Sequence, residues 1–301
     1  MPAPIKIPSV PPSPSQTTSR PYIGRFAPSP SGALHLGSLA CALASYFDAK
    51  VHQGLWLVRM EDIDPPREPA GAADAIVECL IKHELHWDCE ILYQSTRTAA
   101  YQRTLAQLKA KQLTYYCQCS RKILRTLNGV YDGHCRYLQH TDGAIKFNIQ
   151  HASTLGLNTQ VSFIDTLCGT QQQDLLASGD FIIHRKDGLF AYQLAVITDD
   201  IAQGITHIVR GDDLLDVTFN QLMLFETLDY QAPQFTHIPV LLDDRGYKLS
   251  KQHGAPAVDI NTPQKNIYTC LQQMGFTPPP HANTKQLLSW GIDAWHVRCF
   301  S

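Results

Sequence analysis

Near the start of the chain, the spacing of apolar residues predicts a strand, a helix and a second strand in close succession. Residues 22–27 alternate with a period of two, a turn rich in Pro, Ser and Gly follows at 28–32, and a helical pattern covers about 34–52. A short apolar run at 55–60 predicts the second strand. A strand–helix–strand unit of this length is typical of a parallel sheet.

The middle of the chain interrupts this pattern. Residues 115–187 show only short strand-like runs, at 144–149, 161–164 and 181–184, together with clustered cysteines. This change is typical of an inserted domain. Outside the insertion, further helices are predicted at about 70–84, 98–111 and 216–227, and further strands at 205–209 and 237–242.

These patterns predict an α/β protein with a parallel sheet, organised in four parts. The first part, residues 1–20, is rich in Pro, Ser and Thr, and we expect it to be a disordered arm. The others are a parallel-sheet domain at 21–114 and 188–260, an insertion domain at 115–187, and a tail at 261–301 with short helices at about 267–274 and 285–290.

Composition places the chain among ordinary globular proteins. It has 301 residues, of which 44% are hydrophobic and 17% charged, and no apolar stretch approaches the roughly 20 residues that span a bilayer. Nine cysteines without a secretory signal favour a reducing compartment. We therefore expect a cytoplasmic monomer without membrane contact.

Positive charge is concentrated in one segment, although the formal net charge is only −2. Residues 101–150 contain eight Lys or Arg and two Asp, a net charge of +6. This segment is either a surface that faces phosphate groups or an ordinary solvated face.

Polar side chains follow several predicted strands directly. Glu61 comes after the strand at 55–60, Arg210 after the strand at 205–209, and Lys248 and Lys251 after the last strand. Because ligands of open α/β sheets bind outside the carboxyl ends of the strands, we expect these residues to converge on one crevice.

Two short motifs indicate a nucleotide site. His35-Leu36-Gly37-Ser38 stands at the start of the first predicted helix, where free N–H groups suit phosphate oxygens. Lys248-Leu249-Ser250-Lys251-Gln252 is a cationic loop that can neutralise a triphosphate. Taken singly, the first motif also fits a capping histidine, and the second an exposed basic turn.

The pair of motifs resembles the two signature motifs of class I aminoacyl-tRNA synthetases, His-Ile-Gly-His and Lys-Met-Ser-Lys-Ser. The chain departs from each at one position, with Ser38 and Gln252. The resemblance implies a Rossmann-like catalytic domain, ATP as a substrate with Mg²⁺, and catalytic or ATP-binding roles for His35, Gly37, Ser38, Lys248 and Lys251. With serine at 38, His35 has more of the phosphate stabilisation to perform.

Three further segments, at 25–32, 59–64 and 209–213, are similar to glutamyl-tRNA synthetases and imply glutamate as the amino acid. Guanidinium groups suit the two carboxylates of glutamate, and an acid suits its ammonium group. Alternatively, Arg25 and Glu61 pair with each other. The implied glutamate-binding residues are Arg25, Phe26, Ala27, Pro28, Ser29, Glu61, Tyr192 and Arg210.

Three cysteines of the insertion, Cys117, Cys119 and Cys135, lie within nineteen residues and are expected to hold one structural zinc ion. The fourth ligand is open on chemical grounds. Imidazole favours His134, but neighbouring residues seldom bind one ion together. The spacing with Tyr131 is similar to that in a family of shortened glutamyl-tRNA synthetase paralogues, the glutamyl-Q tRNA(Asp) synthetases, and this resemblance implies Tyr131.

Only fifty residues follow Lys251, fewer than an anticodon-reading domain needs. The paralogue resemblance implies that glutamate is activated without tRNA and attached to the queuosine base of tRNA(Asp), with the insertion as the acceptor-binding domain. Two alternatives stay open: a truncated ordinary glutamyl-tRNA synthetase, and an inactive synthetase-like protein that binds RNA or regulates.

Overall fold

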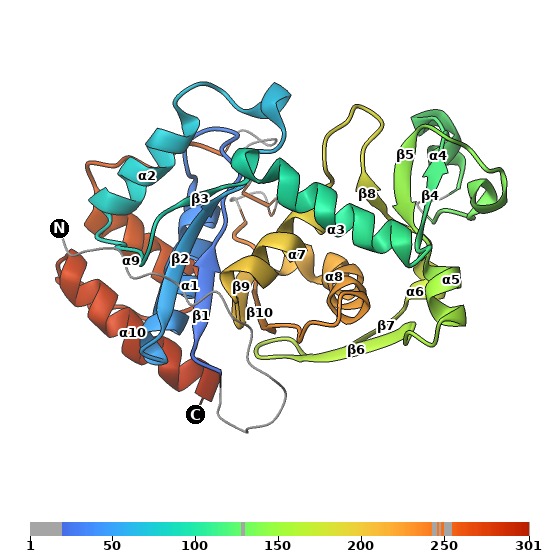
Figure 1. Ribbon diagram of the computed structural model, residues 1–301. Helices are drawn as coiled ribbons and strands as arrows, with labels where there is room; N and C mark the ends of the chain where they lie inside the picture. Colours follow the sequence, from blue (N-terminus) through green and yellow to red (C-terminus); the bar gives the residue numbers. More distant parts are fainter. Residues whose placement is uncertain (1–19, 128–129, 243–245, 247, 250–254, 301) are drawn as a thin grey trace. The chain divides into compact units, whose positions relative to one another are not determined.

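The computed structural model describes residues 20–127, 130–242, 246, 248–249 and 255–300 (Figure 1). Most of the expected N-terminal arm and three residues of the lysine loop, Ser250, Lys251 and Gln252, lie outside the described residues. Contacts divide the chain into two compact units. Unit 1 comprises Met1–Tyr93, Gln203–Asp213 and Pro233–Ser301, and unit 2 comprises Gln94–Ala202 and Leu214–Ala232. These units are defined by contacts between residues. The division into an arm, a catalytic domain, an insertion and a tail stays a prediction from the sequence.

Unit 1 contains parallel strands, as the first patterns predict. β1 (Ile23–Phe26) pairs in parallel with β2 (Leu55–Met60), β2 with β3 (Leu92–Tyr93), and β9 (His207–Gly211) with β10 (Gln234–Ile238). The backbone N–H of Thr206 donates to the carbonyl of Ile23, 2.9 Å away, so β9 begins beside β1. The carboxyl ends of these strands therefore lie on one side of the unit.

The helices described in unit 1 are α1 (Leu36–Val51), α2 (Ala72–Lys82), α9 (Pro263–Gln273) and α10 (Thr284–Phe300), with a 3₁₀ turn at Pro65–Arg67. Of these, α1 packs against β1, β2 and β9, and α9 and α10 pack against α1. The tail helices are docked rather than loose. Trp295 is fully buried and its indole N–H donates to Asp48 of α1 at 2.9 Å. Gly291 lies so close to α1 that an added Cβ would stand 2.5 Å from the ring of Phe47.

Unit 2 has small antiparallel sheets and helices. β4 (Thr114–Cys117), β5 (Ala144–Phe147) and β8 (Ile182–His184) form one sheet, and β6 (Gln160–Asp165) pairs with β7 (Gly169–Asp174). Its longer helices are α3 (Thr98–Ala110), α7 (Tyr192–Gln203) and α8 (Leu215–Thr227). Short helices complete it: α4 (Arg121–Thr126), α5 (Ile149–Thr154), α6 (Leu175–Ser178), and 3₁₀ turns at Gln94–Arg97 and His134–Tyr137. A further 3₁₀ turn, Asp212–Leu214, begins in unit 1 and ends at the first residue of the second segment of unit 2.

Several predicted boundaries were wrong. The last strand was predicted at 237–242, but β10 ends at Ile238 because Pro239 has no N–H to donate to the ladder. The preceding strand was predicted to end at Val209, and β9 runs on through Gly211, so Arg210 lies within it. The final helix was predicted at 285–290, and α10 covers seventeen residues.

Helix α7 was not predicted at all. Residues 194–200 are all buried, including the polar Thr198, Asp199 and Asp200, so this helix has no exposed face at these positions and its sequence lacks the usual contrast between an apolar and a solvent-facing side. Among the described residues, no helix has both the length and the hydropathy needed to cross a bilayer.

Candidate active site

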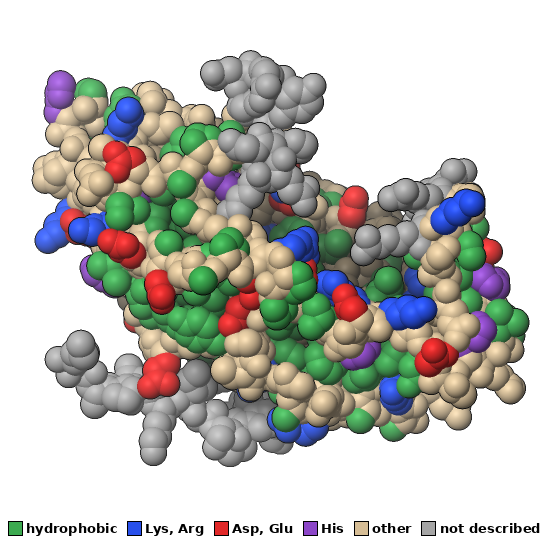
Figure 2. All heavy atoms as spheres, turned by 90° about the horizontal axis from the view of Figure 1, so that it is seen from above, with side chains coloured by type: hydrophobic (Ala, Val, Ile, Leu, Met, Phe, Trp, Pro, Cys, Tyr) green, Lys and Arg blue, Asp and Glu red, His purple; other side chains and the backbone are tan. Residues whose placement is uncertain are grey.

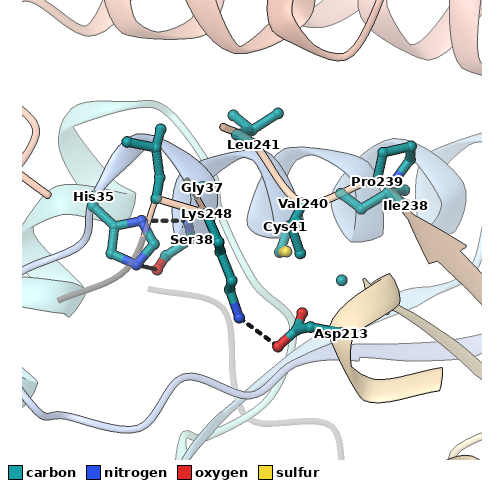
Figure 3. Close-up of a pocket in the computed structure, with 12 residues that line it drawn as sticks. His35, Gly37, Ser38, Cys41, Asp213, Ile238, Pro239, Val240, Leu241 and Lys248 are labelled. Carbon is teal, nitrogen blue, oxygen red and sulfur yellow. Dashed lines mark hydrogen bonds and ion pairs between the residues drawn. The ribbon is translucent and has the colours of Figure 1, made fainter. Parts of the chain in front are cut away.

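A pocket of about 170 Å³ opens in unit 1 at the start of α1 (Figure 3). It brings the 35–38 motif together with Lys248 and Leu249, the described residues of the lysine loop. Its walls come from the first turn of α1, the end of β9, the segment after β10, and the described part of the lysine loop. The lining residues are His35, Gly37, Ser38, Cys41, Gly211, Asp213, Ile238, Pro239, Val240, Leu241, Lys248 and Leu249.

His35 is the N-cap of α1, and Ser38 holds its ring from two sides. The Ser38 N–H donates to His35 Nδ1 at 3.2 Å, and the Ser38 hydroxyl lies 3.0 Å from His35 Nε2. Because Nδ1 accepts a hydrogen bond, a neutral His35 carries its proton on Nε2. Ser38, the residue that departs from the His-Ile-Gly-His motif, therefore orients His35. The Nε2–H donor of His35 lies at the N-terminus of α1.

Gly37 leaves little room for a side chain beside His35. A Cβ at this position would stand 3.1 Å from two atoms of the His35 ring and 3.4 Å from the carbonyl oxygen of Leu249. The ring contacts are tighter than ordinary van der Waals separations, so a side chain at 37 would push the His35 ring aside by a few tenths of an ångström.

Lys248 reaches the pocket from beside the segment that follows β10. The N–H of Leu249 donates to the carbonyl of Leu241 at 2.8 Å, and the Lys248 ammonium group lies 2.5 Å from a carboxylate oxygen of Asp213.

Cys41 also lines the pocket. Burial, with a smaller contribution from the Asp213 carboxylate, raises the pKa of the Cys41 thiol to about 12. The thiol is therefore protonated at neutral pH and contributes no charge.

The charged residues of unit 1 that are predicted to bind glutamate are buried near the carboxyl ends of the parallel strands. Arg25 lies in β1, Glu61 follows β2 directly, and Arg210 lies in β9, with exposed fractions of 3%, 6% and 4%. The N–H of Glu61 donates to the carbonyl of Pro28 at 2.9 Å, which joins the acid to the 25–29 segment. In that segment Phe26 and Pro28 are buried, Ala27 is half-buried and Ser29 is exposed.

Two residues to which the sequence assigned no role support these charges. Arg59 is fully buried; its Nη1 donates to Gln203 at 3.0 Å and its Nε lies 3.8 Å from Glu61. His237 accepts a hydrogen bond of 3.1 Å from Arg210. Arg59 lies in β2, two positions before Glu61, which follows that strand directly, and the alternation of side chains along a strand could have identified it.

Two residues predicted for the active site do not lie among the described residues of unit 1. Tyr192 is the first residue of α7 in unit 2, where it is half-buried. Lys251 lies outside the described residues. The roles assigned to both from the sequence stay predictions.

The three predicted cysteine ligands meet in unit 2. The sulfur atoms of Cys117, Cys119 and Cys135 all lie within 4.8 Å of one another, and those of Cys119 and Cys135 are 3.6 Å apart. Zinc–sulfur bonds of about 2.3 Å put tetrahedral sulfur ligands about 3.8 Å apart. The cluster therefore has the chemistry and the dimensions of a zinc site.

Both candidates for the fourth ligand lie beside the cysteines. The hydroxyl of Tyr131 lies 3.5 Å from Cys117 sulfur and 3.8 Å from Cys119 sulfur, and it accepts a 3.1 Å hydrogen bond from the Cys135 N–H. The ring nitrogens of His134 lie 3.8 and 3.7 Å from the sulfurs of Cys119 and Cys135. Tyr131 is buried and His134 is exposed, which favours Tyr131 as part of the cluster.

The positive charge of residues 101–150 is not all at the surface. Arg136 Nε donates to the buried Asp180 carboxylate at 2.6 Å, and Lys146 donates to the Asp180 carbonyl at 2.9 Å. Lys111 lies 3.0 Å from Asp229. Figure 2 shows positive side chains in several separate groups on one face, with acidic side chains between them. The segment therefore exposes fewer cations than it contains, because Arg136 and Lys146 bind Asp180 inside unit 2.

Comparison with known proteins identifies the family. The family model "tRNA synthetases class I (E and Q), catalytic domain" matches residues 23–288. Glutamyl-Q tRNA(Asp) synthetases from Citrobacter koseri and Vibrio cholerae are 47% and 46% identical to this chain, with 92% of it covered and 93% and 91% of theirs. The enzyme of that name from Escherichia coli K12 is 45% identical, covering 94% of this chain and 91% of its own.

A solved structure shares the fold. The glutamate tRNA ligase of Elizabethkingia meningosepticum, crystallised with its amino acid, superposes with a TM-score of 0.72 at 23% identity and covers 89% of this chain. The present chain spans 64% of that protein's length. The chain therefore belongs to the class I tRNA synthetases of the glutamate and glutamine group, which are ATP-dependent ligases, and within them to the glutamyl-Q tRNA(Asp) synthetases.

Proposed function

We propose that this enzyme activates glutamate with ATP in the absence of tRNA and transfers the glutamyl group to the queuosine base of tRNA(Asp). One observation carries the proposal: the pocket at the start of α1 and the buried charges of Arg25, Glu61 and Arg210 belong to one compact unit with parallel strands. The relatives named for this activity match along at least 91% of their own length.

Glutamate binding rests on charge complementarity. Arg25 and Arg210 would receive the two carboxylates, and Glu61 the ammonium group. All three side chains are buried. A glutamate that binds there would therefore exchange its own hydrating water for charged groups that the protein holds in place. Phe26, Ala27, Pro28 and Ser29 would line the pocket, and Tyr192 would frame the substrate as in the glutamyl-tRNA synthetases that the motifs resemble.

Activation needs no protein nucleophile. A carboxylate oxygen of glutamate attacks the α-phosphorus of ATP, the bond to pyrophosphate breaks, and glutamyl-adenylate forms. The N–H of His35 and the ammonium groups of Lys248 and Lys251 would stabilise the charge that develops on the phosphate oxygens. Lys248 would exchange its contact with Asp213 for a phosphate. ATP enters as its magnesium complex.

In the second step a hydroxyl oxygen of the queuosine ring attacks the glutamyl carbonyl carbon. The bond between that carbon and the phosphate oxygen breaks, AMP leaves, and an ester forms. The hydroxyl proton passes to the departing phosphate or to water.

We further propose that Cys117, Cys119, Cys135 and Tyr131 hold one structural zinc ion. When bound, the ion would join β4 to the 3₁₀ turn at His134–Tyr137, in a part of unit 2 with a small apolar core. The insertion at 115–187 would then serve as a stable acceptor-binding domain.

Two measurements test the proposal. Glutamate-dependent exchange of pyrophosphate into ATP, without tRNA, tests activation. Transfer of labelled glutamate to tRNA(Asp) with and without queuosine, and to tRNA(Glu), tests the acceptor. We expect exchange without tRNA and transfer only to queuosine-containing tRNA(Asp). Transfer to tRNA(Glu) would instead identify a truncated glutamyl-tRNA synthetase, and absent exchange would identify a binding protein.

A further inference from the structure

His237 lies beside Arg210 in the buried core of unit 1. The two residues stand directly opposite each other on the parallel strands β10 and β9. Their side chains are 0% and 4% exposed, and Arg210 Nε lies 3.1 Å from His237 Nε2.

The direction of this hydrogen bond follows from chemistry. An arginine in a protein keeps its proton and has no acceptor atom, so Arg210 donates and His237 Nε2 accepts. A histidine that accepts at Nε2 is neutral and carries its proton on Nδ1. The imidazole therefore serves as a polar support for a buried cation and adds no charge.

Phe235 constrains the same guanidinium group from a second direction. Its ring centroid lies 5.2 Å from Arg210 Cζ. Phe235 stands two residues before His237 on β10, and their rings are nearly parallel, at 9°. An acceptor at Nε sets the rotation of the guanidinium plane, and an aromatic face limits its tilt.

We propose that His237 is a positioning residue for the amino-acid site: it fixes the plane of the Arg210 guanidinium so that its terminal nitrogens meet a glutamate carboxylate. This inference rests on the glutamate-binding role proposed for Arg210. A carboxylate that binds both terminal nitrogens requires a defined plane, because two parallel hydrogen bonds form only in that plane.

The test is steady-state pyrophosphate exchange with variants at position 237. His237→Phe keeps a ring but removes the acceptor, and we expect the KM for glutamate to rise about tenfold, while the KM for ATP and kcat stay within about twofold. His237→Gln places a carbonyl oxygen near the position of Nε2, and we expect it to stay within about threefold of the wild type. His237→Asn is too short to reach Arg210 and should resemble His237→Phe; it replaces that variant if the phenylalanine does not fold.

His83 provides a matched control. It is fully buried in unit 1 and its Nε2 lies 3.0 Å from the side-chain amide nitrogen of Asn266. His83→Phe therefore removes a buried imidazole of the same kind elsewhere, and we expect a lower melting temperature with an unchanged KM for glutamate.

Three results would overturn the inference: equal rises in both KM values, a His237→Gln variant as impaired as His237→Phe, or no change in any variant. If the wild type itself shows no glutamate-dependent exchange, the proposed function fails, and the inference fails with it. A wild type with normal exchange separates the two failures.

Discussion

The sheet edge of unit 1 and the cysteine cluster of unit 2 gather polar groups in different ways. At the sheet edge, each charged residue stands on or just after a buried parallel strand, and neutral protein partners support two of them: Gln203 beside Arg59, and His237 beside Arg210. In the cluster, three thiols and a phenol converge from one short strand and surrounding turns. The first arrangement is held by the fold, whereas the second would be held by the proposed zinc ion, bound to its thiolates. Changes at the sheet edge should therefore affect the core or catalysis, and changes at the cluster the insertion alone.

The largest effect is expected from breaking the buried charges at the sheet edge. Arg59→Met leaves Glu61 without its neighbouring guanidinium, and removal of one partner of a buried ion pair costs about 3–5 kcal/mol in the free energy of unfolding. Thermal unfolding measures this loss. Arg67 and Asp64 form an exposed pair, so Arg67→Met is the control and should cost no more than about 1 kcal/mol. Equal losses in the two variants would contradict internal support at the edge.

The next effect concerns catalysis alone. Lys251→Ala should reduce glutamate-dependent pyrophosphate exchange by about 10² to 10³, because a donor to the transition state is lost. The melting temperature should not change. Lys265, an exposed lysine of α9, gives the control Lys265→Ala. Normal exchange in Lys251→Ala would refute the role of the loop.

A change in the cluster should separate the two units functionally. Metal analysis should find about one zinc ion per chain, which Cys119→Ser loses. Transfer to tRNA should then fall about tenfold or more, while exchange stays within about twofold, because the cluster is not part of unit 1. Cys168→Ser, at an exposed cysteine, should retain the metal. An active enzyme without metal would remove the zinc assignment.

The fourth ligand can be determined by a paired comparison. Tyr131→Phe keeps the ring and removes the hydroxyl, and we expect zinc affinity to fall about tenfold, as measured by competition with a chelator. His134→Ala should change affinity much less, because His134 is exposed. The opposite order would assign the histidine.

The smallest effect is on the pH dependence of stability. Burial lowers the pKa of His83, and likewise that of His207. The unfolded chain therefore binds these protons more readily, so the free energy of unfolding decreases as the pH falls below about 6.5 and is unaffected well above that value. His83→Gln should lose less melting temperature between pH 7.5 and 5.5 than the wild type. An equal loss would show that other groups dominate.

Local patterns predicted the elements in which periodicity is strong. The strand at 55–60 coincides with β2, and the helix predicted at 34–52 with α1 at Leu36–Val51. Helix α7 could not be predicted, because residues 194–200 are buried on all sides. The position of β10 depends on Pro239, whose effect on the strand outweighs the apolar run beyond it.

The candidate site was predictable where chemistry and position coincide in a short segment. Residues 35–38, the charges at Arg25, Glu61 and Arg210, and the cysteine spacing could all be identified in this way. Their supports could not be, because Gln203 is 144 residues from Arg59, and His237 is 27 from Arg210. Such partners meet only when the folded chain packs, and a pattern within a short segment carries no information on which distant residues will meet.

The sequence by itself determined the family, the two halves of the nucleotide motif and the clustering of three thiols, since each depends on short segments of residues near one another in the chain. Only the tertiary structure decided which charges face water. Asp180 binds Arg136 and Lys146 inside unit 2, so a segment with a net charge of +6 exposes fewer cations than it contains. The reason is physical: a buried charge requires a partner, and that partner can come from any part of the chain that folding brings near it.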